Sequence, residues 1–149
     1  MHQFSKDLPA KDCPLPTAID CDNTVYKLFK SYPFENADCQ TQAEMGKALN
    51  AVGDAACNRH GLSVFPTMSS CLHQLKLFPY LGPYVGEAKL EANHGKIATT
   101  SSNNNPEHMT WWSDVRVNRQ ELFKIYTYFP IINILVGAGM FFWVLKLAQ

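Results

Sequence analysis

The feature that most constrains this chain is a run of 21 residues without a formal charge, from Ile125 to Leu145. Eleven of these residues are Ile, Leu, Val or Phe. As an α-helix the run would be about 31 Å long at ~1.5 Å per residue, which matches the ~30 Å hydrocarbon core of a bilayer. We therefore predict a transmembrane helix at about 125–145. The alternative is a helix buried in the core of a globular domain.

The residues at the two ends of this run are typical of side chains that anchor a helix at the membrane–water interface. The predicted anchors are Tyr126, Tyr128, Trp143 and Lys146. Pro130 lies one turn into the run and predicts a kink, because its ring lacks an N–H and clashes with the carbonyl of the preceding turn.

A patch of small residues in the middle of the run indicates contact with another membrane helix. Small side chains let two helices approach closely, and an amide one turn away can form a hydrogen bond between them. The predicted packing residues are Asn133, Gly137, Ala138 and Gly139. The alternative is that glycine is simply common in membrane helices.

The remainder of the chain predicts a mainly α protein, made of short helices and extended arms, with little or no β-sheet. One apolar face at helical spacing (Val25, Leu28 and Phe29) favours a helix from about residue 22 to 31. We expect further helices from about 36 to 59 and from about 66 to 77. The predicted segments are an extended Pro-rich arm at 1–20, a small helical region at 21–78, an irregular loop at 79–112 and a long helix at 113–149 that includes the span.

Five cysteines leave their pairing open. The predicted antiparallel helices favour a disulfide among Cys39, Cys57 and Cys71, although small buried thiols are an equal alternative. Two thiols and two imidazoles at Cys57, His60, Cys71 and His73 would suffice for tetrahedral zinc, but their spacing matches no recognised finger. We expect His2, His94 and His108, which lie in polar stretches, to be solvated.

The chemistry of the sequence excludes several classes of function. Thirteen basic and thirteen acidic side chains give a net charge of zero, which argues against general nucleic-acid binding. There is no phosphate-binding glycine loop, nucleophile elbow or zinc-protease helix. We therefore expect no enzymatic activity, no cofactor of the chain's own and no small-molecule substrate.

In layout, the chain resembles the single-span supernumerary subunits of mitochondrial respiratory-chain complexes and of the ATP synthase. The resemblance rests on the Pro-rich arm, the single span with its Gly137–Gly139 patch, and an acidic N-terminal segment unlike a cleaved presequence. It implies a non-catalytic role in assembly or stability, with other complex subunits and membrane lipids as partners and with lipid as a bound molecule. A tail-anchored adaptor of the outer mitochondrial or endoplasmic reticulum membrane is the alternative.

The predicted location is the mitochondrial inner membrane, crossed once, with two opposing signals for its orientation. Arg116, Arg119 and Lys124 precede the span and only Lys146 follows it, which favours the matrix side for residues 1–124. A disulfide would favour the intermembrane space instead, because such bonds persist in oxidising compartments.

Overall fold

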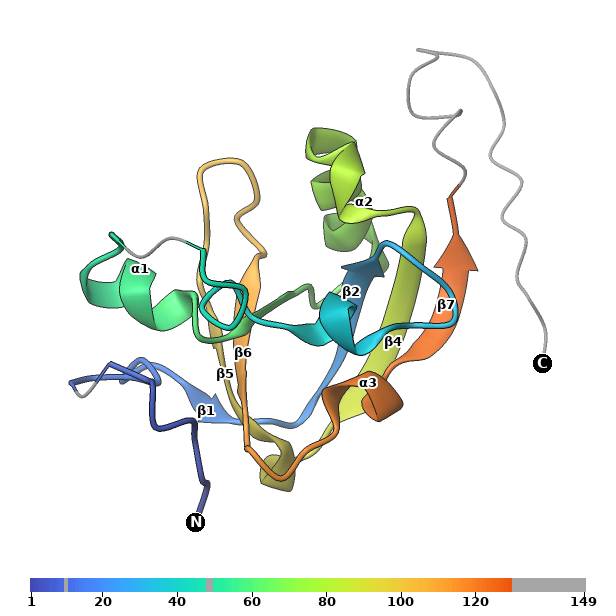
Figure 1. The fold of residues 1–149 in the computed structure, drawn as a ribbon. Coiled ribbons are helices and arrows are strands. Elements are labelled where there is room, and N and C mark those ends of the chain that lie inside the picture. The colour runs from blue at the N-terminus through green and yellow to red at the C-terminus, as the bar shows by residue number, and fades with distance from the viewer. Residues whose placement is uncertain (10, 48–49, 130–149) are drawn as a thin grey trace.

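Strands rather than helices dominate the architecture, which is known from a computed structural model that describes residues 1–9, 11–47 and 50–129. The first sheet is antiparallel, with the order β1 (Ile19–Asp20), β5 (Gly95–Thr99), β6 (Met109–Ser113) and β3 (Leu62–Val64). The second has the order β2 (Asn23–Phe29), β4 (Tyr84–Leu90) and β7 (Lys124–Tyr128) (Figure 1). The prediction of a mainly α fold is therefore wrong.

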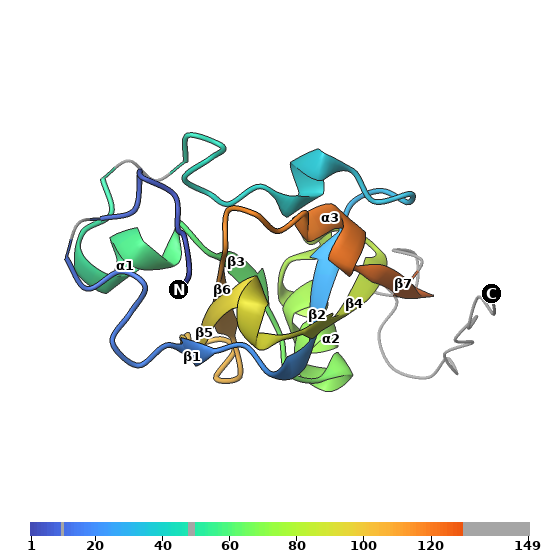
Figure 2. The ribbon, with the colours of Figure 1, turned by 90° about the horizontal axis from the view of Figure 1, so that it is seen from below.

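The short helices lie in the connections between the strands (Figures 1 and 2). Three are α-helices: α1 (Gly53–Asn58), α2 (Met68–Leu77) and α3 (Arg119–Leu122). Three are single 3₁₀ turns: η1 (Asn36–Cys39), η2 (Pro79–Leu81) and η3 (Ala92–His94).

The segment predicted as a helix at about 22–31 contains strand β2 instead. Every residue from Asn23 to Phe29 pairs with a residue of β4. Val25 and Phe29 belong to the core between the two sheets, whereas Leu28 belongs to a second core that includes residues of α2. A strand buried on both faces places apolar residues at positions that also fit one side of a helix.

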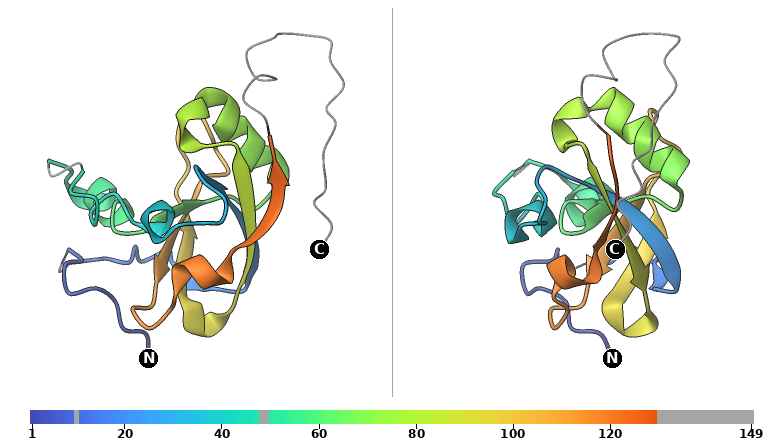
Figure 3. Two further views of the ribbon diagram at one scale, coloured as in Figure 1. Left: turned by 45° about the vertical axis from the view of Figure 1, so that its right-hand side comes forward. Right: turned by 90° about the vertical axis from the view of Figure 1, so that its right-hand side faces the viewer.

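The two sheets share one core and, in the described residues, are joined by one isolated β-bridge. Val25, Phe29 and Leu90 of the three-stranded sheet pack with Val64 and Trp111 of the four-stranded sheet. Tyr26 and Phe65 exchange two backbone hydrogen bonds, of 2.8 and 2.9 Å. On the opposite face of the three-stranded sheet, α2 lies against β2 (Figure 3).

Helix α2 is the one helix that closely follows the sequence prediction, which placed it from about 66 to 77. Its first turn is capped because the Thr67 hydroxyl accepts from the Ser70 N–H at 3.1 Å. The Ala-rich segment at 36–59 instead contains only η1 and α1 among its described residues. Gly46 and Gly53 have positive φ angles of 67° and 58°, a backbone conformation that interrupts a helix.

The C-terminal part of the described chain overturns the predicted membrane anchor. Residues 124–128 form β7, with Glu87 of β4 opposite Lys124 and Tyr84 opposite Tyr128. The β-branched and aromatic residues of this segment favour a strand, and β4 supplies the backbone partners. The helix predicted at 113–149 is limited, within the described residues, to the four residues of α3.

In the described part of the chain, no helix is long and apolar enough to cross a membrane. The predicted span at about 125–145, with its membrane and transmembrane assignment and its single-pass inner-membrane location, is corrected on these findings. Residues 130–149 lie outside the described part of the chain. They include Pro130, the predicted packing patch of Asn133, Gly137, Ala138 and Gly139, and the predicted anchors Trp143 and Lys146.

The N-terminal arm is tied to the four-stranded sheet. Cys13 forms a disulfide with Cys57 of α1, with the two Cα atoms 5.5 Å apart. Nearer the N-terminus, the backbone N–H of Gln3 donates to the buried Asp114 carboxylate at 2.9 Å, and the Gln3 carbonyl accepts from Val115 at 2.8 Å. The outer face of the sheet is therefore partly covered by this arm and by α1.

Candidate functional site

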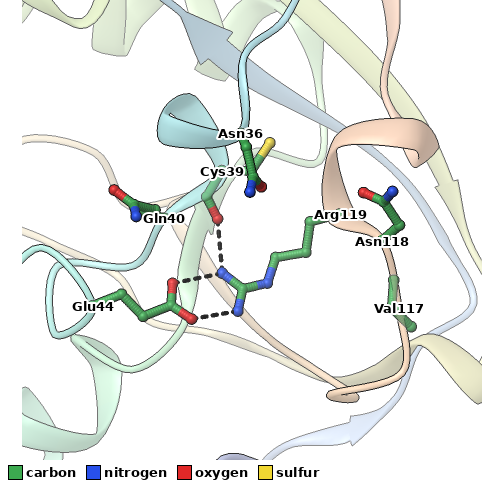
Figure 4. A pocket seen from close by; sticks show the side chains of 7 residues that line it. All are labelled: Asn36, Cys39, Gln40, Glu44, Val117, Asn118 and Arg119. Atoms are coloured by element: carbon green, nitrogen blue, oxygen red, sulfur yellow. Dashed lines mark hydrogen bonds and ion pairs between the residues drawn. The ribbon is translucent and has the colours of Figure 1, made fainter.

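A surface groove lies between the segment that carries η1 and the segment that leads into α3 (Figure 4). Its volume is about 350 Å³, within the ~300–1,000 Å³ typical of ligand sites. The groove, called the Arg119 groove below, is lined by Asn36, Cys39, Gln40, Glu44, Val117, Asn118 and Arg119. Two segments about 80 residues apart in the sequence therefore form its walls.

The guanidinium of Arg119 connects these walls. Its Nη1 donates to the Cys39 carbonyl at 2.7 Å and to Glu44 Oε2 at 2.7 Å, and its Nη2 donates to Glu44 Oε1 at 2.6 Å. Its Nε donates to the Ser113 hydroxyl at 2.9 Å. Four of the five N–H groups of the guanidinium are thus used within the protein.

Glu44 is held in position from its own side of the groove. Its Oε2 accepts from the Thr41 N–H at 2.7 Å, and its backbone N–H donates to the Thr41 hydroxyl at 3.1 Å. Hydrogen bonding to Arg119, with a further contribution from Thr41, lowers the pKa of Glu44 to about 2. The carboxylate therefore stays ionised and paired at any ordinary pH.

The free polar groups of the groove are mainly neutral. Glu44 and Arg119 neutralise each other, which leaves the exposed side-chain amides of Asn36, Gln40 and Asn118. Gln120, in α3, also donates from Nε2 to the Phe34 carbonyl, a second link between the two walls. The groove is therefore preformed, with amide donors and acceptors around a small apolar contact at Val117.

Two further recesses adjoin the Arg119 groove. One, of about 190 Å³, lies under the N-terminal arm and shares Glu44 and Arg119 with the groove. The other, of about 550 Å³, lies beyond Val117 and Asn118 and includes Asn93 and Glu121. Together they extend the groove in two directions.

Apart from Cys39, which was predicted as a disulfide cysteine, the groove residues were not among the sites predicted from the sequence. One local signal was present: Thr41 and Glu44 have the spacing of a capping box, in which each side chain bonds the other's backbone N–H. That signal fixes the position of Glu44 but does not identify Arg119 as its partner. The pair depends on the fold, because 74 residues lie between its two members.

The predicted cysteine and histidine cluster is not assembled. Cys57 is bonded to Cys13, whereas Cys39 and Cys71 are buried free thiols. His60 follows α1 and His73 lies in α2, at different parts of the molecule (Figure 1). Within the described ranges, no three His, Cys, Asp or Glu side chains are grouped as ligands of one metal ion.

The disulfide partner expected for Cys57 was Cys39 or Cys71, and the structure places Cys13 there instead. The Cα distance lies within the usual ~4.4–6.8 Å range of disulfides. Because disulfides persist in oxidising compartments, this bond also argues against the matrix side predicted from the flanking charges.

The three histidines expected to be solvated all make hydrogen bonds. His2 Nε2 lies 2.8 Å from Asp20 Oδ1, and His94 Nδ1 accepts from the Glu91 N–H at 3.0 Å. His108 bonds to Ser63 and Thr100. The hydrogen-bond partner is supplied by another segment for His2 and His108, and by a residue three positions earlier for His94.

Tyr126 and Tyr128, predicted as interfacial anchors, lie on β7 and pack against tyrosines of the other two strands of that sheet. Tyr126 meets Tyr26 edge to face, with ring centroids 5.3 Å apart, and Tyr128 lies 5.0 Å from Tyr84. Both remain partly exposed. Their position in the sheet explains them without a membrane interface.

Comparisons with protein-family models, with curated protein sequences and with solved structures give no match to this chain.

Proposed function

We propose that this chain is a binding module that holds an uncharged, polar segment of a partner protein in the Arg119 groove, and that it serves the assembly or stability of a larger complex. This retains the assembly role and the protein partners expected from the sequence, but not the membrane anchor. The observation that carries the proposal is a preformed groove whose two charges are neutralised by each other.

An extended peptide segment suits the chemistry of this groove. Each peptide unit brings one donor and one acceptor, and burying either of them without a hydrogen-bond partner costs free energy. The amides of Asn36, Gln40 and Asn118 each offer both kinds of group. Because the walls are already linked through Arg119, the groove does not have to form when a segment binds.

A charged ligand suits the groove less well. A ligand carboxylate would compete with Glu44 for Arg119, and a ligand cation would compete with Arg119 for Glu44. Either exchange would break a bidentate pair, the strongest type of side-chain ion pair. The amides and the adjoining recesses leave room for a neutral segment that breaks neither bond.

Site-specific photo-crosslinking tests the proposal. Benzoylphenylalanine is placed at Gln40, in the groove, or at Lys89, which is exposed on β4 and outside it. In cells that make the protein, we expect a discrete adduct with one partner at position 40 and none at position 89. Mass spectrometry of the adduct then identifies the partner segment.

The identified segment provides the quantitative control. Titrated as a synthetic peptide into the purified protein, it should bind several-fold more weakly to the Asn118→Ala variant, because one neutral hydrogen bond is worth about 1 kcal/mol. Equal adducts at both positions, or unchanged affinity in Asn36→Ala and Asn118→Ala, would contradict the proposal.

A further inference from the structure

The outer face of the four-stranded sheet carries a connected set of polar side chains. Ser63, in the middle of β3, lies opposite Thr110 of β6. His108 immediately precedes β6 and Thr100 immediately follows β5, and the Thr100 N–H donates to the His108 carbonyl at 2.9 Å. Since side chains alternate along strands, Ser63, His108 and Thr110 project on the same face.

Three polar contacts fix the orientation of the His108 ring. Nε2 lies 2.9 Å from the hydroxyl oxygen of Ser63, and Nδ1 lies 3.1 Å from the Thr100 carbonyl oxygen and 2.9 Å from its hydroxyl. A carbonyl can only accept, so the bond to it requires the hydrogen on Nδ1, and the Thr100 hydroxyl oxygen can accept from the same N–H. In the neutral ring Nε2 then has the lone pair, and the Ser63 hydroxyl donates to it.

The surroundings keep His108 in this neutral form. Burial lowers the pKa of His108 below its ordinary value, and only the Thr100 carbonyl opposes the shift. The ring of Phe65 stands edge to face with the imidazole, at a centroid distance of 5.7 Å. Ser63, in contrast, is exposed. A half-buried base is therefore paired with an accessible hydroxyl.

The loop that delivers His108 is fixed to α2. Asn105 is buried, and its Nδ2 donates to the Ser70 carbonyl and to Gln74 Oε1, both at 3.1 Å. His73 also contacts the Asn104 carbonyl, at 2.6 Å. These bonds fix the loop to α2 and so help to hold the His108 imidazole in place beside Ser63.

We infer that Ser63 is a nucleophile activated by His108, and that it accepts an acyl group from small, uncharged carboxylic esters. The inference goes beyond the binding role of the Arg119 groove and departs from the expectation of no enzymatic activity. Its basis is the arrangement of nucleophile, base and orienting carbonyl, which is the arrangement that activates a serine hydroxyl. Exposure of Ser63 at the sheet surface suits esters with small acyl groups and good leaving groups.

The reaction balances without another reagent. Ser63 Oγ bonds to the ester carbonyl carbon while its proton passes to His108 Nε2. The tetrahedral intermediate expels the alcohol oxygen, which takes that proton, and an acyl ester of Ser63 remains. Water then attacks this ester while giving a proton to His108 Nε2. The serine oxygen leaves with that proton, and the acid is released.

The test uses the full chain with p-nitrophenyl acetate at neutral pH. We expect one acetyl group on Ser63 by intact mass and peptide mapping, with nitrophenolate release above the buffer rate. Ser63→Ala and His108→Gln should each lower this rate by about tenfold or more, since a positioned base contributes roughly 10²–10⁴-fold. Ser69→Ala, an exposed serine on α2, should leave the rate unchanged.

Surface imidazoles also attack this ester, so Ser63→Ala is the decisive variant. A rate that survives in Ser63→Ala but falls in His108→Gln would identify His108 as the nucleophile and overturn the inference. Acetylation confined to lysines or tyrosines, or a rate unchanged in both variants, would show that Ser63 and His108 form a structural polar ladder only. Circular dichroism of each variant checks that the fold is retained.

Discussion

At the scale of single residues, the Arg119–Glu44 pair determines both the shape and the charge of the groove. Arg119 uses both terminal nitrogens on one carboxylate and a third bond on the Cys39 carbonyl. The pair is partly exposed, with 23% of the Arg119 side chain and 41% of the Glu44 side chain accessible. Solvent therefore screens part of the attraction, and its geometry matters more than its strength.

Glu44→Gln should lower the free energy of unfolding by about 1 kcal/mol at pH 7, a value that allows for solvent screening. The folded-state pKa of Glu44 is lowered to about 2 from 4.5, so its stabilising contribution is complete above pH 4.5 and is lost as the pH falls from 4.5 towards 2. The difference between the wild type and the variant should therefore shrink over this range. Urea denaturation followed by tryptophan fluorescence at several pH values measures it.

The matched control is Glu107→Gln, which neutralises an exposed carboxylate away from the groove. It should change the unfolding free energy only slightly at pH 7. A wild-type advantage over Glu44→Gln that persists unchanged at pH 2 would show that the ion pair is not its source.

At the scale of elements, the N-terminal arm and α1 behave as one covering layer on the four-stranded sheet. Phe4, Leu8 and Leu15 of the arm pack against the cluster formed by Cys57, Ala98 and Trp112. The indole N–H of Trp112 donates to the Cys57 carbonyl at 3.0 Å. The arm has almost no regular structure, so its position depends on these contacts and on its two attachment points, Cys13 and Gln3.

Replacing both Cys13 and Cys57 by serine should lower the free energy of unfolding by about 2–4 kcal/mol. The bond closes a loop across a sequence separation of 44, and its loss gives the unfolded chain more conformations. Chemical denaturation with and without a thiol reductant measures the effect. Reductant should destabilise the wild type but leave the double variant unchanged, whereas an equal response of both would contradict the assignment.

At the scale of the whole molecule, the two sheets should unfold as one unit. They are joined along the backbone only by the Tyr26–Phe65 bridge in the described residues, yet their facing side chains form a single core. Phe29 and Leu90 lie on one side of that core, and Val64 and Trp111 lie on the other. Neither sheet can bury its apolar face without the other.

Hydrogen exchange during urea unfolding tests this cooperativity. Peptides from β4 and from β6 should lose protection at the same denaturant midpoint, as two-state unfolding requires. Val64→Ala, in the four-stranded sheet, should lower both midpoints equally, through a loss of about 2 kcal/mol from the core. A midpoint for β4 that stays fixed in this variant would show that the sheets unfold separately.

The parts of this protein that could be predicted from the sequence are those that rest on local interactions. The sequence predicted a helix at about 66–77, and the structure shows that Thr67 and Ser70 cap this helix, α2, through neighbouring backbone groups. The irregular loop predicted at 79–112 agrees with the structure in the segment that joins β5 to β6, whereas the same range also contains β4, β5 and most of β6. In each case the hydrogen bonds that fix the backbone come largely from residues a few positions away.

The sheets, the disulfide and both candidate sites depend on contacts between segments that are far apart in the sequence. The segments at 23–29 and 124–128 became strands because β4 lies between them and supplies the backbone partners of each. Separations of 75, 44 and 45 residues lie between the partners of the Arg119–Glu44 ion pair, the Cys13–Cys57 disulfide and the His108–Ser63 hydrogen bond, respectively. Apolar spacing in a strand buried on both faces resembles that of a helix, and long-range pairing leaves no local signal, so these contacts depended on the fold.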